Sequence, residues 1–533
     1  MRRFAQDVLL LALATGISRV FGLFRDVAIA DRFGMTAAYD AFLIAFFVPH
    51  FLRQLLAEGA LSTAFVPVYT KLRFRDESSS TEPASDPRAD RTRRHDSAGA
   101  FASNVLSWLL MLFPVVVAVG ILIAPSYVPF LASGFDGDKL ALATTLTRII
   151  FPFIALIGLA SVFMGILNAQ HRFFAAALAP VWFNVGMILG VLVIAPRFPQ
   201  QPVLGLAIGA LAGGAGQLLS QIPALLRCGF RFRFSLLPLH PGIRRLARLM
   251  GPAVLALAVT QVNLLVDNKL ASHLGDGGIS ALQYGMRLFQ LPLGVFAVSV
   301  ATALLPRFSA AWARRDEAGF SSYLADGVVA SALVLLPAMA GLLILGTDVI
   351  RLLFQHGSFT AADTLRTSRV LSLYVIGLLP YGWVYVFSRA FYALGRTMIP
   401  LAASVVAVAL NVTLDLALVS SMQEAGLALA TAIAGGGSAI LLGALLWPRL
   451  RTDVRLPRLL RDLGLIAVGC LTLSGLTWLV RWSVRSGPVG LTVFAPLLTG
   501  VLVYGAYVRL TPLWALVGSL RTEWGRDSSV KGP

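Results

Sequence analysis

The sequence predicts an all-α integral membrane protein with about 14 transmembrane helices, and its composition and long apolar runs are the first two observations behind this prediction. Of the 533 residues, 57% are hydrophobic and only 13% are charged, whereas soluble globular chains are roughly 45–50% apolar and 25% charged. The runs 99–125 and 331–346 contain no charged residue. Because a spanning helix needs about 20 mostly apolar residues, such runs indicate repeated crossings of a membrane.

The predicted spans follow one another along the whole chain, and their even number places both termini on the same side. The first 16 residues, MRRFAQDVLLLALATG, have the basic start and short apolar run of a signal peptide. The apolar pattern continues past Arg19 towards Ala30, so we predict an uncleaved first helix. The spans are 6–30, 38–68, 99–131, 141–168, 176–195, 203–226, 246–272, 279–305, 322–346, 368–394, 398–420, 425–447, 460–481 and 488–510.

Arginine is concentrated in the loops that follow even-numbered spans, and this asymmetry predicts the orientation. The loop 71–98 carries seven basic residues among Ser, Pro and Asp, and we predict it to be solvated and disordered. Because basic loops stay in the cytoplasm, both termini are predicted to be cytoplasmic. The net charge of +18 is then explained without nucleic acid as a partner. The other arginines of these loops are Arg227, Arg231, Arg233, Arg244, Arg245, Arg248, Arg307, Arg314, Arg315, Arg449, Arg451, Arg455, Arg458 and Arg461.

A weak internal repeat is the third observation. The segment 61–71 resembles 301–311, and the segment 167–185 resembles 392–412. Both pairs are shifted by six helices, so the copies have the same orientation and form a parallel repeat. Such repeats pack as two lobes with the substrate site between them. We therefore predict a six-helix lobe over 1–228, a second over 240–450, an extra two-helix unit over 455–515 and a cytoplasmic tail over 516–533.

Charged residues inside the predicted spans indicate a polar cavity. An arginine at the bilayer centre costs about 2.5–3.5 kcal/mol on insertion scales and usually faces water or a bundle interior. Snorkelling at a helix end is the alternative, and it suits Arg53 better than Arg19 or Arg25. Several arginines without lysine suit a multiply anionic group such as pyrophosphate. The residues are Arg19, Arg25 and Asp26 in the first span, Asp40, His50, Arg53 and Gln54 in the second, and Arg287 and Gln290 in the eighth.

A second polar set lies in spans seven, eleven and twelve. Thr260, Asn263 and Asp267 fall on one helical stripe, and Asn411 and Asp415 are one turn apart. With Thr431 they offer carboxylate, amide and hydroxyl oxygens, which suit a hard cation such as sodium or a proton relay. A buried hydrogen-bond network between helices is the alternative.

The sequence contains no pattern typical of an enzyme site. Its six histidines lie in different segments without metal-ligand spacing, and Cys228 and Cys470 are far apart. No Walker loop, HExxH or GxSxG motif occurs. We predict a protein without catalytic residues or a tightly bound cofactor.

The segment ISRVFGLFRDVAIADRFG, followed by YDAFLIAFFVPHFLRQLLAEGALSTAFVPVY, resembles the N-terminal signature of the MurJ (MviN) family. Further similarity lies in GILNAQHRF, YGMRLFQLPLGVFAVSVATALLP and LFQHGSFTAADT. The resemblance covers nearly the whole chain and weakens after about residue 450. This family consists of lipid II flippases and belongs to the superfamily that also holds MATE drug exporters.

The resemblance implies roles for individual residues. Arg19, Arg25, Arg53 and Arg287 match the family's cavity arginines, which are implied to hold the substrate's pyrophosphate, and Ser18, Asp26 and Asp40 match polar positions of the same motif. Asp267, Asn411, Asp415 and Thr431 fall on a sodium site of some members. The last two helices are implied to form a groove for the polyprenyl tail. His50, Gln54 and Gln290 depart from the asparagine, arginine and glutamate of some members, which changes the charge balance of the cavity.

The function implied is the transfer of lipid II from the inner to the outer leaflet of the bacterial cytoplasmic membrane by alternating access. Its partners would be lipid II and membrane lipids. A flippase for another polyprenyl-pyrophosphate-linked glycan and a MATE-like antiporter are alternatives, although a drug exporter predicts carboxylates rather than arginines in the cavity. A scaffold that recruits cell-wall synthesis proteins through 71–98 and the tail is the alternative from another class.

Overall fold

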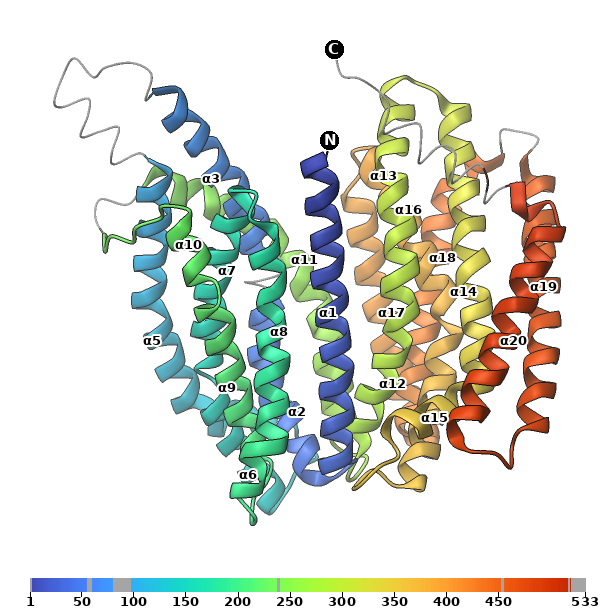
Figure 1. Cartoon of the computed structure of the whole chain (residues 1–533), viewed down its shortest axis with the longest axis horizontal. Coiled ribbons are helices and arrows are strands. Elements are labelled where there is room, and N and C mark those ends of the chain that lie inside the picture. The colour runs from blue at the N-terminus through green and yellow to red at the C-terminus, as the bar shows by residue number, and fades with distance from the viewer. Residues whose placement is uncertain are drawn as a thin grey trace. The chain divides into compact units, whose positions relative to one another are not determined.

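The structure is a computed structural model that describes residues 2–54, 60–79, 97–236, 240–451, 455–515 and 518. These residues form helices joined by turns, with no β-strand among them, as the sequence predicts (Figure 1). Two compact units can be distinguished: unit 1 is Met1–Gly278 with Gly357–Phe359, and unit 2 is Ile279–His356 with Thr360–Pro533. Most of the loop 71–98 and nearly all of the tail 516–533 lie outside the described residues.

Unit 1 contains the helices that carry most of the predicted cavity residues. Helix α1 packs against α8, α8 against α9, α2 against α6, and α3 against both α7 and α11. The elements are α1 (Arg2–Phe33), α2 (Ala37–Arg53), α3 (Ala60–Ser79), α5 (Ala98–Leu131), α6 (Gly137–Ile150), α7 (Phe153–Ala169), α8 (Phe173–Leu189), the π-helix η2 (Gly190–Ile194), the 3₁₀-helix η3 (Ala195–Arg197), α9 (Leu204–Leu219), α10 (Ile222–Arg227) and α11 (Pro241–Ala271).

Unit 2 begins within α12 and ends after the last hairpin. Helix α17 packs against α18, α13 against α16, and α14 against α15, α16 and α19. The elements are α12 (Gly278–Pro292), the π-helix η4 (Leu293–Ala297), α13 (Val298–Ala313), α14 (Glu317–Phe354), α15 (Ala361–Ile376), α16 (Leu378–Ala393), α17 (Met398–Met422), α18 (Glu424–Arg451), α19 (Arg455–Ser483) and α20 (Val489–Leu510).

All 14 predicted spans coincide with helices. Ten helical segments of the described chain are long and apolar enough to cross a membrane, and α15 with α16, bent by 40° at Gly377, makes an eleventh if counted as one span. The other three spans coincide with α1, with α2 and α3 together, and with α11. Each of these helices contains or adjoins residues or side chains that the structure does not describe. The long apolar runs of the sequence thus form the spanning helices.

The two units repeat the same helix pairings at a shift of six spans. In unit 1, α3 and α5 pack against α7, α9 packs against α6 and α7, and α8 packs against α9. In unit 2, the corresponding pairs are α13 and α14 against α16, α18 against α15 and α16, and α17 against α18. Helix α11 belongs to the compact unit 1 although the predicted first lobe ends at residue 228. The lobe boundaries defined by the repeat therefore stay a prediction, because packing divides the chain differently.

One pair of turns shows the repeat at atomic detail. After α7, His171 has φ 58°, and the Arg172 amide donates to Leu167 O at 2.8 Å. After α16, Gly395 has φ 72°, and the Arg396 amide donates to Phe391 O at 2.9 Å. Both turns thus end a helix with a left-handed residue and a six-to-one hydrogen bond. They lie in the segments whose sequences, 167–185 and 392–412, resemble each other.

Glycines allow α8 and α9 to lie unusually close. A Cβ atom added at Gly186 would lie 2.3 Å from the Cα atom of Gly213, and one at Gly209 would lie 2.8 Å from the Cα atom of Gly190. Small residues spaced along both helices permit this contact in membrane proteins. The contact packs α8 closely against α9, and α8 also packs against α1.

The last two helices form a hairpin on the rest of unit 2. Helices α19 and α20 pack together and against α14. Ile466, Cys470 and Val508 join Leu333 in a buried apolar cluster, and an ion pair connects Arg481 to Asp348. This placement agrees with an extra two-helix unit outside the repeat.

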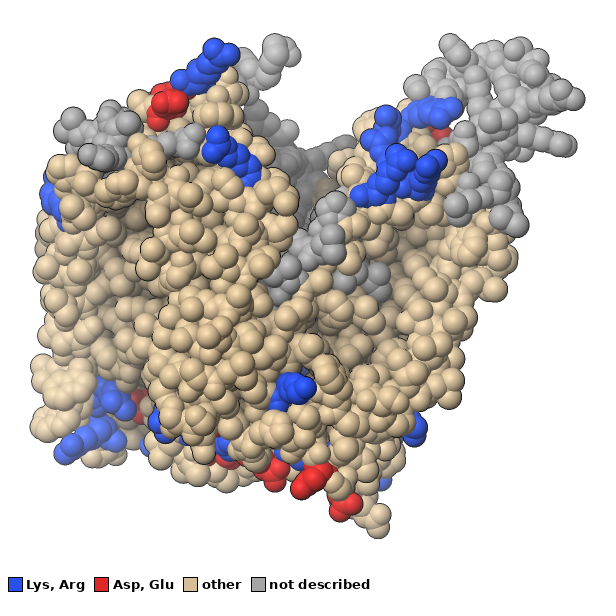
Figure 2. Space-filling model, turned by 180° about the vertical axis from the view of Figure 1, so that it is seen from behind, with Lys and Arg blue, Asp and Glu red and all other residues tan. Residues whose placement is uncertain are grey.

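The distribution of charge matches membrane insertion. Figure 2 shows lysine and arginine at the two ends of the helices and a band of uncharged side chains between them. Large apolar side chains of the helices are exposed, for example Leu122 on α5 and Ile440 on α18. Contact of such side chains with lipid tails is favourable, whereas their contact with water is not.

Candidate functional site

Arg25 is the best fixed of the predicted cavity residues. Its Nε and Nη2 atoms donate to Asp26 Oδ1 at 3.0 and 2.7 Å, and its Nη1 atom donates to Asn184 Oδ1 at 3.0 Å. The Asn184 amide in turn donates to Ser18 O at 3.2 Å, so α8 binds α1 at two levels. The side chains of Arg25 and Asp26 keep 12% and 15% of their exposure. The guanidinium group is thus oriented and partly neutralised, and the side chain as a whole is not fully buried.

Arg19 does not join this cluster. The structure shows its side chain exposed, six positions before Arg25 on α1. At about 100° of rotation per residue it lies about 120° around the helix from Arg25. Ser18 shares the face of Arg25, which explains why Asn184 contacts both. The prediction that Arg19 and Arg25 bind the same group stays a prediction.

Asp40 lies in the first turn of α2, shortly after α1 ends, and it is fully buried. Its Oδ2 atom accepts hydrogen bonds from Lys139 Nζ at 3.2 Å and from the Gly277 amide at 2.8 Å. Lys139 also contacts Asp276 at 2.8 Å. In these contacts Asp40 holds two turns together, so the structure gives it a positioning role. Its predicted contact with substrate stays a prediction.

Arg53 belongs to a polar group that joins α2 to α11. Its Nη2 atom lies 3.5 Å from His50 Nδ1, and Gln54 Nε2 lies 3.2 Å from His50 Nε2. Gln261 of α11 donates to Gln54 Oε1 at 2.6 Å. His50, Arg53 and Gln54 therefore share a helix face, as predicted. His50 and Gln54, the two residues of this face that differ from some family members, contact each other.

Arg287 lies half-buried on α12, in unit 2, and Gln290 is exposed on the same helix. The six other predicted substrate-binding residues lie on α1 and α2 in unit 1. Within unit 1, the structure brings Ser18, Arg25 and Asp26 together through Asn184. The predicted cavity between two lobes stays a prediction.

Three of the four predicted cation ligands lie on two packed helices of unit 2. Asn411 and Asp415 on α17 and Thr431 on α18 are buried, and Asn411 Nδ2 donates to Thr431 Oγ1 at 3.3 Å. Asp267 lies on α11 in unit 1, where Asn263 Nδ2 donates to Asp267 Oδ2 at 3.2 Å. The side chain of Thr260 lies outside the described residues.

The oxygen ligands of this set are of a kind that suits a hard cation better than a transition metal, and the predicted cation site stays a prediction. Asp415 and Asn411 offer carboxylate and amide oxygens one helical turn apart, and Thr431 adds a hydroxyl oxygen. Oxygen ligands of this kind suit hard cations. No cluster of three His, Cys, Asp or Glu side chains that could hold a metal occurs in the described part of the chain.

Sequence reasoning missed Asn184, Gln261 and Lys139. The repeat could have pointed to Asn184, because it pairs FNV at 183–185 with LNV at 410–412. Asn411 in the second copy is one of the predicted cation ligands. No sequence pattern pointed to Gln261 or Lys139, because their hydrogen-bond partners are distant in sequence.

Comparison with known proteins decides the family. The family model described as "Lipid II flippase MurJ" matches residues 29–498. The chain belongs to the MurJ family. A probable lipid II flippase MurJ of Thermotoga maritima is 31% identical over 97% of this chain and 98% of its own length. A lipid II flippase MurJ of Burkholderia cenocepacia is 35% identical over 71% of each chain.

Solved structures agree with this family assignment. A lipid II flippase MurJ in an inward closed conformation matches with TM-score 0.76 and 29% identity over 94% of this chain and 98% of its own. An inward-facing MATE multidrug transporter matches with TM-score 0.66 and 16% identity over 83% of this chain and 97% of its own, and it shares the fold alone. The chain is therefore a multi-pass membrane protein of the MurJ family.

Proposed function

We propose that this MurJ-family chain moves lipid II from the inner to the outer leaflet of the bacterial cytoplasmic membrane. The observation that carries the proposal is Arg25, a guanidinium group that Asp26 and Asn184 hold within a predicted membrane helix and whose side chain is not fully buried. Guanidinium groups pair with phosphate oxygens in a bidentate manner, and the relatives that cover most of this chain are named lipid II flippases.

The proposed mechanism needs no bond to be broken, so the chain acts as a transporter and not as an enzyme. Arg19, Arg25, Arg53 and Arg287 would capture the pyrophosphate of the headgroup, and the polyprenyl tail would stay in lipid beside α19 and α20. Rearrangement of the two lobes would then expose the headgroup on the other side. Both termini would be cytoplasmic, as the arginine-rich loops predict.

Sodium is proposed as the coupling ion. Asn411, Asp415 and Thr431 supply three kinds of oxygen in one buried place, and Asp267 would join them as the fourth ligand. The partners of this protein among the cell-wall synthesis proteins stay a prediction, because most of the predicted recruiting segments 71–98 and 516–533 lies outside the described residues.

The decisive test measures outer-leaflet lipid II in cells depleted of this protein, with a probe that does not cross the membrane. We expect the outer pool to fall while total lipid II rises. Arg25→Ala and Arg287→Ala should fail to restore the outer pool, because loss of a charged hydrogen bond of about 1.5–3 kcal/mol weakens binding at least about tenfold. Arg314→Ala, at an exposed arginine after α13, is the matched control and should restore it.

The opposite result would overturn the proposal. If Arg25→Ala and Arg287→Ala both restored the outer pool at normal protein levels, these arginines would not hold the headgroup. If depletion left outer-leaflet lipid II unchanged in a strain without other flippases, the cargo would be a different lipid-linked molecule.

A further inference from the structure

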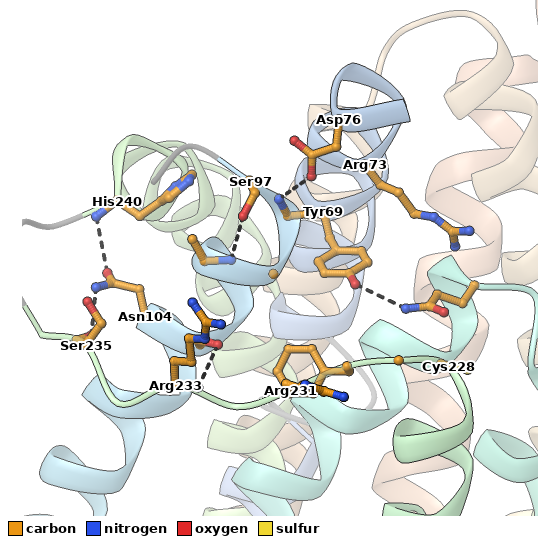
Figure 3. Close-up of a pocket in the computed structure, with 17 residues that line it drawn as sticks. Tyr69, Arg73, Asp76, Ser97, Asn104, Cys228, Arg231, Arg233, Ser235 and His240 are labelled. Carbon is orange, nitrogen blue, oxygen red and sulfur yellow. Dashed lines mark hydrogen bonds between the residues drawn. The ribbon is translucent and has the colours of Figure 1, made fainter. Parts of the chain in front are cut away.

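A cationic pocket of about 660 Å³ lies in unit 1, at the end where α1 begins (Figure 3). It is formed by the last turns of α3, the first turns of α5, the turn after α7, and the segment that follows α10. Pockets of about 300–1,000 Å³ accommodate small ligands. Its lining contains none of the residues predicted to bind lipid II or sodium, so the proposed function does not account for it.

The segment 230–236 is held in a non-helical path along α5. Ser103, Asn104 and Ser107 form a buried polar patch on this otherwise apolar helix. Figure 3 shows Asn104 of this patch facing Ser235 of the segment. The connecting hydrogen bonds run from Arg233 N to Ser103 Oγ (3.3 Å), from Ser235 N to Ser107 Oγ (2.9 Å), from Asn104 Nδ2 to Ser235 O (2.8 Å) and from His240 N to Asn104 Oδ1 (3.2 Å).

These bonds hold the backbone segment from which two arginine side chains line the pocket. Arg231 and Arg233 line it from the segment, and Arg73 lines it from α3. Within the described chain, Arg231 and Arg233 take part in no ion pair, and both are exposed. Asp76 supplies the single carboxylate of the lining, and it accepts a hydrogen bond from the Ala98 amide at 2.8 Å. Positive charge therefore exceeds negative charge in the lining.

Neutral donors complete the lining. Tyr69 is buried, and its hydroxyl oxygen accepts a hydrogen bond from Gln170 Nε2 at 3.2 Å. The hydroxyl hydrogen is then available to donate to a ligand. The start of α5 adds the positive end of a helix dipole, where Asp76 already shows that an anion is stabilised.

We propose that this pocket binds a phosphate-bearing anion, which is either the headgroup of an anionic phospholipid or a soluble phosphate compound. Guanidinium groups on two sides of one cavity suit the several oxygens of a phosphate ligand better than they suit the two oxygens of a carboxylate ligand. The ligand would bridge α3 and α5 through the segment 230–236. In the predicted orientation, the pocket opens at the cytoplasmic end of the protein.

The test compares three full-length proteins purified in a neutral detergent. The pocket variant is Arg231→Gln with Arg233→Gln, and the matched control is Arg244→Gln with Arg245→Gln, which removes two exposed arginines from the start of α11 outside the pocket. Titration calorimetry with inorganic pyrophosphate tests the soluble source. Native mass spectrometry with dihexanoyl phosphatidylglycerol, against dihexanoyl phosphatidylcholine, tests the lipid source. Thermal unfolding verifies that all three proteins fold equally well.

We expect at least a tenfold loss of affinity in the pocket variant and less than a twofold change in the control, for one of the two probes. A loss confined to phosphatidylglycerol identifies the lipid source, and a loss confined to pyrophosphate identifies the soluble source. Equal losses in both variants would overturn the proposal, since they would indicate non-specific attraction to a basic surface. Absence of binding to the unaltered protein would overturn it as well. Because all three proteins retain Arg25, failure here would leave the proposed transport intact.

Discussion

Arg25 illustrates what an arginine requires inside a helical membrane protein. The carboxylate of Asp26 neutralises part of its charge, and the amide oxygen of Asn184 satisfies a third N–H group. A charged group without such partners would be too costly in a lipid environment. The same contacts fix the direction of the guanidinium group. The contacts that make Arg25 tolerable inside the membrane therefore also orient it for the proposed binding of phosphate.

At this scale we predict that Asn184→Ala lowers lipid II transport several-fold, because Arg25 loses an oriented acceptor worth about 1.5–3 kcal/mol. Asn184→Asp keeps an oxygen facing Arg25 and should recover most of the activity. Transport into the outer leaflet is measured at matched protein levels. If Asn184→Asp were as impaired as Asn184→Ala, the contact with Ser18 O would matter and the orientation of Arg25 would not.

At the scale of elements, equivalent turns of the repeat use different residues for one backbone shape. Gly395 adopts the left-handed conformation without strain, whereas His171 carries a side chain in the same conformation. A left-handed residue other than glycine costs roughly 1–2 kcal/mol. His171 recovers part of this cost through an edge contact with the ring of Phe173, whose centroid is 5.6 Å away.

We therefore predict opposite changes at the two turns. His171→Gly should stabilise the protein by about 0.5–1 kcal/mol, and Gly395→Ala should destabilise it by about 1 kcal/mol. A Cβ atom at Gly395 would meet no atom within 4 Å, so only the backbone conformation is tested. The measurement is the midpoint of thermal unfolding in detergent. A fall of the midpoint in His171→Gly would contradict the strain argument.

At the scale of the whole molecule, transport must couple to an energy source and to one orientation in the membrane. The buried carboxylate of Asp415 suits the first requirement, since a cation among buried oxygens senses both concentration and potential. The arginine-rich loops suit the second.

We expect sodium to stimulate transport in vesicles and Asp415→Asn to abolish the stimulation while basal transport persists, because one negative ligand is lost. Thr413→Ala is the control, since this exposed side chain bonds only to Ala409 O of its own helix. If transport in the unaltered protein did not respond to replacement of sodium by potassium, Asn411, Asp415 and Thr431 would be a hydrogen-bond network between helices.

The orientation is tested by labelling in spheroplasts with a maleimide that does not cross the membrane. In a Cys228→Ser background, Asp138→Cys should react in intact spheroplasts, and Arg314→Cys should react only after permeabilisation. Both positions are exposed, whereas Cys470 is buried. The reverse pattern would invert the predicted topology.

Local sequence was sufficient to predict the number, the order and the apolar character of the spans, because burial in lipid requires long apolar runs whatever their neighbours. It also determined the family, since the signature around Arg19, Arg25 and Asp26 is local. Tertiary structure decided which polar groups meet: Asn184 with Arg25, Lys139 and Gly277 with Asp40, and Gln261 with Gln54. Such contacts join residues far apart in the chain, and their geometry depends on how closely the helices pack. Local sequence encodes that a helix forms, but the partner of each polar side chain exists only once the helices have come together.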